Sequence, residues 1–467
     1  MVMLLLGCWV TQAELAPGVV RNALDADAII VGSVAGPLAD LGEGGEDLSG
    51  DGVADIVVGQ TGVGARIFDG APAGYTDVDA AEVSLWADGV SGSHSSTYGC
   101  TLHDATGDGR PDLLWLDHAE TSSLLLTPGP MATSDSIGVL ATASIAPSLG
   151  FEGQFACMGD LDGDTTSEIG LGSWQDTPAG IYQGPFSGTR VDPEVTLRGE
   201  DWSPGFAEGN VTQVMSPGDL DGDGLDDVAF IITWGVSPGN QQVGIAYSPL
   251  TGDFDTLDSD IHIANGDTYT RFFLPKSGDL DGDGRADLIL TDKGTDSAAV
   301  VHAWVYTEFP SAQLQESDAT TTFGCAAGCD WLGQSAADVG DLDGNGFDDL
   351  ALSYEVQDYD ALHISQNVAV FLSPFVGTVD VSAADRTIVS TSGPEWWACS
   401  DCAPYGDWWE VASAGDVDGD GMDELLLRGR YVPMSSPSFT PGANVIEDGS
   451  LQDESGAVYL FLGSSLF

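Results

Sequence analysis

Basic side chains are scarce in this chain of 467 residues, which has 12 Lys and Arg against 74 Asp and Glu. The formal net charge is −62. A surface this acidic repels phosphate groups, so the composition argues against nucleic acid or an anionic membrane surface as a partner. It suits a soluble protein, which we expect to be a monomer, in a medium rich in cations.

Long apolar runs are also missing, because no segment approaches the roughly 20 apolar residues of a membrane span. The start of the chain ends in Leu5-Leu-Gly-Cys8 and resembles a bacterial lipobox, although it is short and no Lys or Arg precedes it. We therefore expect residues 1–8 to be a signal peptide with a lipidated Cys8, and residues 9–24 to be a linker. The protein would then be exported, as an outer-membrane or cell-surface lipoprotein or in secreted form, with membrane contact only through the lipid.

Cysteine is sparse, with seven in the chain. Without Cys8 an even number remains, which favours disulfides in an exported protein. The candidates are Cys100, Cys157, Cys325, Cys329, Cys399 and Cys402. The spacings allow Cys325 to pair with Cys329 and Cys399 with Cys402. Cys100 and Cys157 occupy equivalent places on neighbouring repeats. A zinc site built from the last four is the alternative.

Signals for catalysis are weak. The six histidines form no zinc motif and lie near no Gly-x-Ser-x-Gly turn; they are His94, His103, His118, His262, His302 and His363. With 74 acids in the chain, pairs of neighbouring carboxylates say nothing about acid–base chemistry. We therefore assign no catalytic residue.

One acidic loop, in contrast, is repeated seven times. Each copy spans nine residues with oxygen-bearing side chains at positions 1, 3, 5 and 9, and we number the copies loop 1 to loop 7. These side chains are Asp47, Ser49, Asp51 and Asp55; Asp104, Thr106, Asp108 and Asp112; Asp160, Asp162, Asp164 and Glu168; Asp219, Asp221, Asp223 and Asp227; Asp279, Asp281, Asp283 and Asp287; Asp341, Asp343, Asn345 and Asp349; Asp416, Asp418, Asp420 and Glu424.

This spacing predicts a calcium site in each loop, because alternate oxygens on a tight turn can converge on one hard cation. The loop is not an EF-hand, which needs a bidentate Glu at position 12 and flanking helices. Position 12 is apolar in every copy, from Val58 to Leu427, and a strand-like run follows each loop. A plain Asp-Gly hairpin turn is the alternative for any single copy.

The copies are unequal. Loops 4, 5 and 7 have four acids and intact glycines, so we expect them to bind calcium best. Loop 3 has Thr165 where the others have Gly, and loops 1 and 2 carry Ser49 and Thr106 at position 3. We expect those three to bind more weakly.

The loops recur at intervals of 56 to 75 residues, which indicates a repeat architecture. Helical periodicity is absent, and each interval holds four strand-like runs, which we call A to D. Strand A enters the loop and strand B leaves it, as in Phe155–Gly159 and Asp227–Ile231. Strand C follows, as in Val368–Leu372, and then a weaker strand D, as in Glu194–Arg198. Four antiparallel strands per repeat predict an all-β, seven-bladed β-propeller with the calcium loops in its A–B hairpins.

The ends of the chain predict how the ring closes. The seventh repeat stops after strand C, at Phe467, and an extra strand-like run, Ala26–Ser33, precedes the first repeat. We expect this run to serve as strand D of the last blade and to cover its edge.

At this point the chain resembles the FG-GAP repeat family, which includes the head domains of integrin α-subunits and many bacterial exported propellers. The resemblance rests on Gly-Asp-Leu-Asp-Gly-Asp-Gly at 218–224 and 278–284, on variants at 340–346 and 415–421, and on 456–463 as strand C. It covers residues 25–467. It implies a seven-bladed propeller with calcium in the A–B hairpins, commonly used in adhesion or ligand binding.

The expected ligand is a protein or a glycan, bound on the face opposite the calcium loops. Two long insertions, 392–409 in a D–A link and 430–455 in a B–C link, would lie side by side there. Aromatic side chains in and near the first could stack on sugar rings or anchor a partner. They are Trp331, Trp396, Trp397, Tyr405, Trp408 and Trp409. Packing of these rings onto the propeller, a propeller enzyme acting on polysaccharide, and a structural envelope protein remain as alternatives.

Overall fold

The structure, a computed structural model, describes most of the chain after residue 19. The described residues are 20–22, 25–31, 38–41, 45–60, 64–86, 99–117, 123–146, 154–173, 179–199, 210–234, 240–264, 272–292, 302–325, 329, 332–358, 363–389, 410–429 and 457–467.

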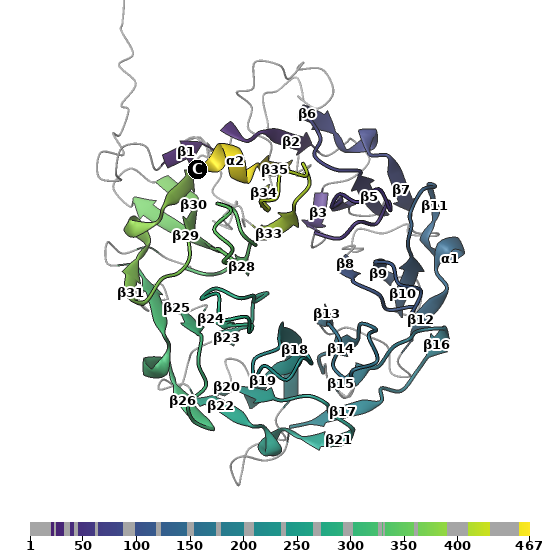
Figure 1. The fold of residues 1–467 in the computed structure, drawn as a ribbon, viewed down its shortest axis with the longest axis vertical. Helices are drawn as coiled ribbons and strands as arrows, with labels where there is room; N and C mark the ends of the chain where they lie inside the picture. Colours follow the sequence, from purple (N-terminus) through teal and green to yellow (C-terminus); the bar gives the residue numbers. More distant parts are fainter. Residues whose placement is uncertain are drawn as a thin grey trace, which may run out of the picture.

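Seven five-stranded sheets stand around one axis, as Figure 1 shows. The innermost strand of each sheet is the predicted strand A, and strands B, C and D follow outward in antiparallel order. The prediction of an all-β, seven-bladed propeller is therefore confirmed. We number the blades so that blade 1 carries loop 1.

The strands of the first four blades follow the chain outward. Blade 1 contains β3 (Leu38–Leu41), β4 (Ile56–Gln60), β5 (Gly64–Phe68), β7 (Val83–Trp86) and β11 (Asp135–Ser136); blade 2 contains β8 (Gly99–Leu102), β9 (Asp112–Asp117), β10 (Ser123–Pro128), β12 (Ala143–Ile145) and β16 (Gly188–Arg190); blade 3 contains β13 (Phe155–Cys157), β14 (Ile169–Leu171), β15 (Ala179–Tyr182), β17 (Val195–Arg198) and β21 (Gly252–Asp255); blade 4 contains β18 (Asn210–Gly218), β19 (Asp227–Trp234), β20 (Asn240–Ala246), β22 (Ile261–Ala264) and β26 (Gln313–Gln315).

The last three blades complete the ring, and short helical turns lie between strands. Blade 5 contains β23 (Phe272–Phe273), β24 (Leu288–Asp292), β25 (Ala303–Tyr306), β27 (Thr321–Gly324) and β31 (Gly377–Asp380); blade 6 contains β28 (Ala336–Asp338), β29 (Leu350–Asp358), β30 (His363–Phe371), β32 (Arg386–Val389) and β1 (Val20–Asn22); blade 7 contains β33 (Glu410–Gly415), β34 (Glu424–Gly429), β35 (Ala457–Phe461), β2 (Ala28–Val31) and β6 (Gly74–Asp77). The helical turns are α1 (Ile137–Leu140), α2 (Gly463–Leu466), η2 (Val78–Ala80), η3 (Thr256–Asp258), η4 (Glu316–Asp318) and η5 (Val381–Ala383). No helix among the described residues has the length and hydropathy to cross a bilayer.

The fifth strand of each sheet was not predicted from the sequence. It pairs in parallel with strand D and, in blades 1 to 5 and in blade 7, comes from the C–D segment of the following blade, as β21 of the fourth repeat pairs with β17. It covers the outer edge that strand D would otherwise present. The sequence gives little signal for it, because two to four residues on a sheet edge are too few to show an apolar alternation.

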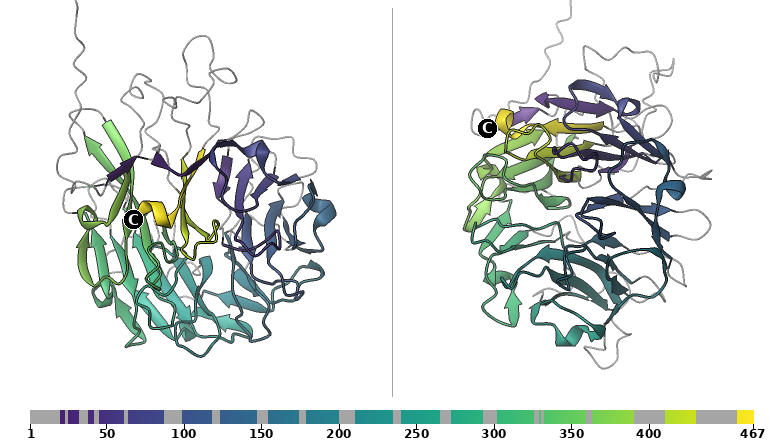
Figure 2. Two further views of the ribbon diagram at one scale, coloured as in Figure 1. Left: turned by 45° about the horizontal axis from the view of Figure 1, so that its top comes forward. Right: turned by 45° about the vertical axis from the view of Figure 1, so that its right-hand side comes forward.

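The N-terminal segment reproduces a C–D segment of the other blades. β1 pairs in parallel with β32 of blade 6, and β2 pairs antiparallel with β35 of blade 7. Asp27 accepts a hydrogen bond from the Leu462 amide at 3.0 Å, just as Asp385 accepts one from the Leu372 amide at 3.0 Å. Figures 1 and 2 both show β1 and β2, in purple, beside the C-terminal blades. Residues 20–22, which fall within the segment 9–24 expected to be a linker, thus pair with blade 6.

The apolar core is divided among the boundaries between blades. Seven clusters of buried side chains lie one between each pair of neighbouring sheets, for example Leu290 of blade 5 against Ile231 of blade 4. Each sheet therefore buries both faces, which explains why strands B and C read as nearly continuous apolar runs. This packing of the blades places the seven loops side by side on one face of the ring.

A disulfide between Cys100 of β8 and Cys157 of β13 joins blades 2 and 3. It spans 57 residues, whereas a second disulfide, Cys325–Cys329, spans four. We predict that a double Cys100→Ser, Cys157→Ser variant loses about 4 kcal/mol of unfolding free energy, because the cross-link restricts a long unfolded loop. Denaturant unfolding measures this. The matched control, Cys325→Ser with Cys329→Ser, should lose about 2 kcal/mol; equal losses would contradict the chain-entropy account.

Candidate metal centres

The backbone of each loop is wrapped around the carboxylate at position 1. In loop 4, Asp219 accepts hydrogen bonds from the amides of Gly222, Asp223 and Gly224 at 2.6, 3.2 and 2.8 Å. Both glycines have positive φ, +81° and +93°, a conformation that L side chains rarely adopt. The Gly residues at positions 4 and 6 are thus required by a turn that aims alternate side chains inward.

The carboxylate at position 9 lies at the base of the loop, where strand B begins. In loop 4, Asp227 is 1% exposed and accepts amide hydrogen bonds from Leu220 and Ser248, both at 2.9 Å. The corresponding side chain is buried in every loop. These residues are Asp55, Asp112, Glu168, Asp227, Asp287, Asp349 and Glu424.

Burial raises the pKa of these carboxyl groups, because the charged form loses its hydration. The pKa reaches about 6 for Asp227, about 7 for Asp349, and about 8 for Asp287 and Glu424. The neighbouring loop acids add to the shift by charge repulsion. A cation among them would relieve both effects.

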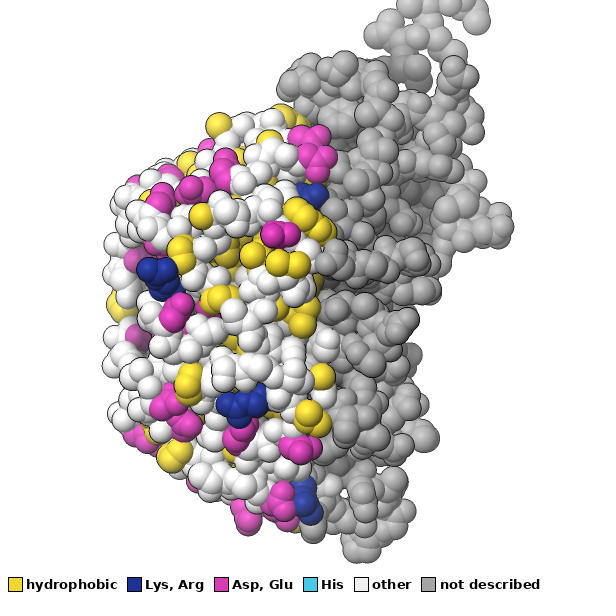
Figure 3. Space-filling view, turned by 90° about the vertical axis from the view of Figure 1, so that its right-hand side faces the viewer, with side chains coloured by type: hydrophobic (Ala, Val, Ile, Leu, Met, Phe, Trp, Pro, Cys, Tyr) yellow, Lys and Arg dark blue, Asp and Glu magenta, His cyan; other side chains and the backbone are white. Residues whose placement is uncertain are grey.

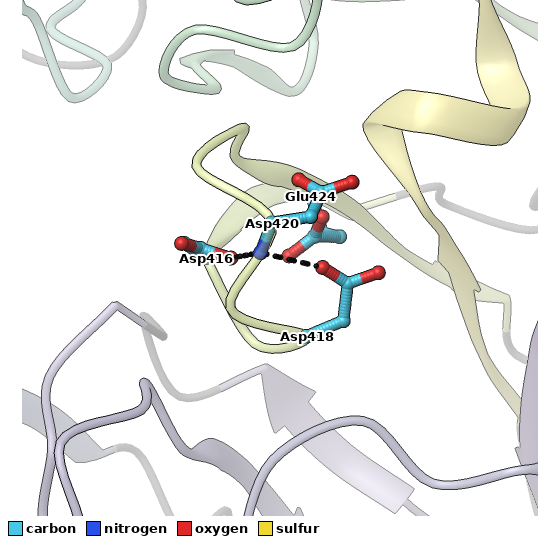
Figure 4. Close-up of side chains that lie close together, drawn as sticks. All are labelled: Asp416, Asp418, Asp420 and Glu424. Carbon is cyan, nitrogen blue, oxygen red and sulfur yellow. Dashed lines mark hydrogen bonds between the residues drawn. The ribbon is translucent and has the colours of Figure 1, made fainter.

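Five of the seven loops gather at least three carboxylates, with one oxygen from each lying within 4.8 Å of the others. Loop 7 brings together all four of its acids, as Figure 4 shows. The groups are Asp160, Asp162 and Asp164; Asp219, Asp221 and Asp227; Asp279, Asp281 and Asp287; Asp341, Asp343 and Asp349; Asp416, Asp418, Asp420 and Glu424. Each of these acidic groups could hold a metal ion, and no His or Cys belongs to any of them.

Among the described loop carboxylates, two buried oxygens lack a hydrogen-bond partner. One is Oε1 of Glu424 and the other is Oδ1 of Asp55, on side chains that are fully buried. An uncompensated buried carboxylate oxygen is costly, and a bound cation is one way to compensate it. The loop 7 acids thus fit a metal ion in both their grouping and their unmet bonding capacity.

Loops 1 and 2 do not gather three acids within this distance, although both lie in the part of the chain that the structure describes. Their position 3 hydroxyl groups donate hydrogen bonds to carboxylates of the same loop. The Ser49 Oγ donates to Asp47 at 3.3 Å, and the Thr106 Oγ1 donates to Asp112 at 3.4 Å. Replacing the position 3 acid with a hydroxyl therefore removes one charge and engages a second ligand.

Loop 3 keeps a group of three acids but differs in its turn. Thr165 occupies the place of the second glycine with φ of +72°, which is uncommon for a β-branched residue. Its neighbour Thr166 donates its hydroxyl to Asp164 at 2.6 Å. The loop holds its conformation without the glycine, at some cost in backbone strain.

Several predicted site residues lie outside the described residues. They are the lipidation candidate Cys8, the aromatic set Trp331, Trp396, Trp397, Tyr405, Trp408 and Trp409, and the cysteines Cys399 and Cys402. His94 and His118 lie outside them too. Cys325, which the zinc alternative needs, is bonded to Cys329.

Acidic side chains are spread widely over the described surface, with only isolated Lys and Arg between them, as Figure 3 shows for one face. The described histidines are dispersed. His103 lies 3.7 Å from Glu46, His302 packs beside Trp304, and the pKa of His262 is lowered by burial. No group of potential metal ligands among the described residues combines acids with histidine.

No protein-family model and no curated protein sequence matches the chain. Among solved structures, the chain is similar to a lectin from Agrocybe aegerita that recognises non-reducing terminal N-acetylglucosamine. The identity is 13%, the match covers 86% of this chain and 90% of that one, and the TM-score is 0.31. We therefore take the fold from the strand pairings above and infer no ligand from this similarity.

Proposed function

We propose that this protein is a non-catalytic, calcium-stabilised β-propeller that acts outside the cell, at the cell surface or in secreted form, and binds a protein or glycan ligand. Membership of the FG-GAP repeat family belongs to the same proposal. The observation that carries the metal part is the grouping of three or four carboxylates in five A–B loops, four of which include the buried position 9 acid.

Calcium is the cation that this donor set favours. Among the described residues, no His or Cys joins the carboxylates that converge, and hard oxygen ligands suit Ca²⁺ better than transition metals, which favour nitrogen or sulfur. When bound, calcium would supply positive charge that offsets the repulsion among the acids of a loop. The side chains at positions 1, 3 and 5 would be ligands from the turn, and the side chain at position 9 would be a ligand from the start of strand B.

Within this proposal, we predict that changing position 3 alters calcium affinity in opposite directions in two loops. Asp281→Asn in loop 5 removes one charged ligand and should weaken its site about tenfold, since such sites are tuned by ligand charge. Ser49→Asp in loop 1 adds the missing acid and should strengthen that site. Calcium titration by calorimetry measures both. Asp258→Asn, an exposed acid beyond the loops, is the control, and an equal effect from all three would argue against specific sites.

A glycan array probed with and without calcium tests the binding function of the full chain. The expected result is calcium-dependent binding of a limited set of glycans, or, if no glycan binds, of a protein partner. A double Trp396→Ala, Trp408→Ala variant should lose that binding and keep its melting curve. Lost stability with retained binding would instead make these tryptophans packing residues, and turnover of a polysaccharide would favour an enzyme.

A further inference from the structure

Neighbouring loops are hydrogen-bonded to each other across the boundary between blades. Between loops 6 and 7, the amide of Asp423 donates to the carbonyl of Asp341 at 2.9 Å. The amide of Asp341 donates in return to Oδ2 of Asp423, also at 2.9 Å. Asp341 is position 1 of its loop and Asp423 is position 8 of the next. Both backbone polar groups of a proposed ligand residue are therefore held by the following loop.

The same reciprocal pair recurs at two other boundaries. Between loops 5 and 6, the Asp348 amide donates to the Asp279 carbonyl at 3.1 Å, and the Asp279 amide donates to Asp348 Oδ2 at 2.8 Å. Between loops 2 and 3, the position 8 residue is Ser167. Its amide donates to the Asp104 carbonyl at 2.7 Å, and its Oγ accepts from the Asp104 amide at 3.3 Å.

Three further boundaries keep the backbone bond from position 8 to the position 1 carbonyl. The donor and acceptor are Asp226 and Asp160 at 2.9 Å between loops 3 and 4, Ala286 and Asp219 at 2.9 Å between loops 4 and 5, and Ala54 and Asp416 at 3.4 Å between loops 7 and 1. Six of the seven boundaries between the loops, all of which lie within the described residues, thus join consecutive loops.

The contact is close enough to dictate a glycine. Each of loops 3 to 7 has Gly immediately before position 1. In loops 3 to 6 a Cβ there would collide with the position 8 residue of the next blade, and in loop 7 it would collide with Gly45. At Gly340 it would lie 2.0 Å from Asp423 Oδ2, and at Gly159 it would lie 1.6 Å from Asp226 Oδ2. These glycines keep the two loops in direct contact.

The boundary between loops 1 and 2 is the exception. Position 8 of loop 2 is Pro111, which has no amide hydrogen to donate. Loop 1 is bonded there to a different part of blade 2, because the Leu48 carbonyl accepts from the Met131 amide at 2.7 Å. The seven loops therefore form an open line that runs from loop 2 through loops 3 to 7 and ends at loop 1.

These hydrogen bonds connect a proposed ligand of one loop to a proposed ligand of the next loop through only a few atoms. Position 1 is a ligand of its own loop, and position 8 is joined by one peptide bond to position 9, a ligand of the next loop. A cation bound in one loop fixes its position 1 residue, to which position 8 of the next loop is hydrogen-bonded. The next loop is therefore already partly ordered, and it loses less conformational entropy when it binds its own cation.

We propose that calcium binding is positively cooperative along this line, each occupied loop favouring its neighbour, with the one break between loops 1 and 2. This inference rests on the proposed calcium binding. Each joined boundary should raise the affinity of the neighbouring site about fivefold, at the lower end of typical coupling between sites.

The chain itself supplies the test variant. Loop 2 reads Gly109-Arg-Pro-Asp112 where loop 5 reads Gly284-Arg-Ala-Asp287. Ala286→Pro therefore copies a natural loop while removing the amide that bonds to Asp219. Native mass spectrometry of the full chain during calcium titration counts the bound ions. Wild type should pass from few to many ions with depleted intermediates, and Ala286→Pro should populate those intermediates, whereas the control Ala286→Ser should behave as wild type.

Each outcome separates the two proposals. If no calcium binds to wild type, the proposed function fails and the coupling fails with it. Calcium binding with a statistical distribution of ions in wild type, or an Ala286→Pro variant identical to wild type, overturns the coupling alone. If Ala286→Pro does not fold, Asp348→Ala and Asp348→Asn decide. Asn keeps an oxygen acceptor for the Asp279 amide and should retain the wild-type distribution, while Ala leaves this boundary with the backbone bond alone and should raise the population of the intermediates. Equal behaviour of those two would overturn the coupling.

Discussion

Removing calcium should lower the melting temperature by about 7 °C. At about 1 mM calcium and a dissociation constant of about 0.1 mM, each site adds about 1.4 kcal/mol to the unfolding free energy by linkage. The five loops that gather three or more acids would together add about 7 kcal/mol. A chain of 467 residues has an unfolding entropy of about 1 kcal/mol/K, which converts this sum to the expected shift.

Scanning calorimetry with and without EGTA measures the effect, and magnesium at the same concentration is the control for general screening of charge. Magnesium should restore little of the lost stability, because it demands a rigid octahedral site and gives up its water reluctantly. An unchanged melting temperature after chelation would contradict the calcium proposal. A shift that sodium chloride alone reproduces would attribute it to charge screening.

Deleting residues 20–34 should cost at least about 6 kcal/mol and cause aggregation. The deletion removes β1 and β2, and with them Ile29 and Ile30, which are 2% and 0% exposed. Two buried isoleucines account for about 3 kcal/mol each. It also exposes the backbone edges of β32 and β35, which now pair with β1 and β2. Unpaired edges invite pairing with a second chain.

Denaturant unfolding and light scattering together test this result. A chain that lacks only residues 9–18 is the matched control and should keep the wild-type midpoint. Asp27→Ala removes the hydrogen bonds to Leu462 and Ser465 but leaves the strand, so its loss should be about 1–2 kcal/mol. A monomeric deletion variant with an unchanged midpoint would make the N-terminal segment a linker after all.

The sequence predicts much of the fold because each repeat is defined by residue types at fixed, short spacings. Ligand spacing, the glycines of the turn and the apolar run after each loop are all set within a dozen residues, so they can be read without knowing the partners of a strand. The extra run at Ala26–Ser33 stands out for the same reason. β1 was missed, because three residues with no apolar alternation give no strand signal; comparison of Asn22–Ala28 with Asp380–Arg386 would have found it, since an acid occupies the same place in both, at Asp27 and Asp385.

The position 8 residues were also missed, although a signal exists. Loops 4, 6 and 7 carry an acid there, at Asp226, Asp348 and Asp423, and each of the loops that precede them has Gly just before position 1. The two features lie 67 to 83 residues apart, so their relation becomes visible only when neighbouring blades are in contact.

By itself, the sequence determined the seven acidic loops, the strands around them and therefore the propeller, because each depends on the spacing of residues within one repeat. The tertiary structure alone decided which loops bring three carboxylates together, which cysteines meet across blades 2 and 3, and how the loops are joined into a line broken at Pro111. These features depend on distances between atoms of different turns or different blades. Such distances are fixed only when the apolar faces of neighbouring sheets pack against each other.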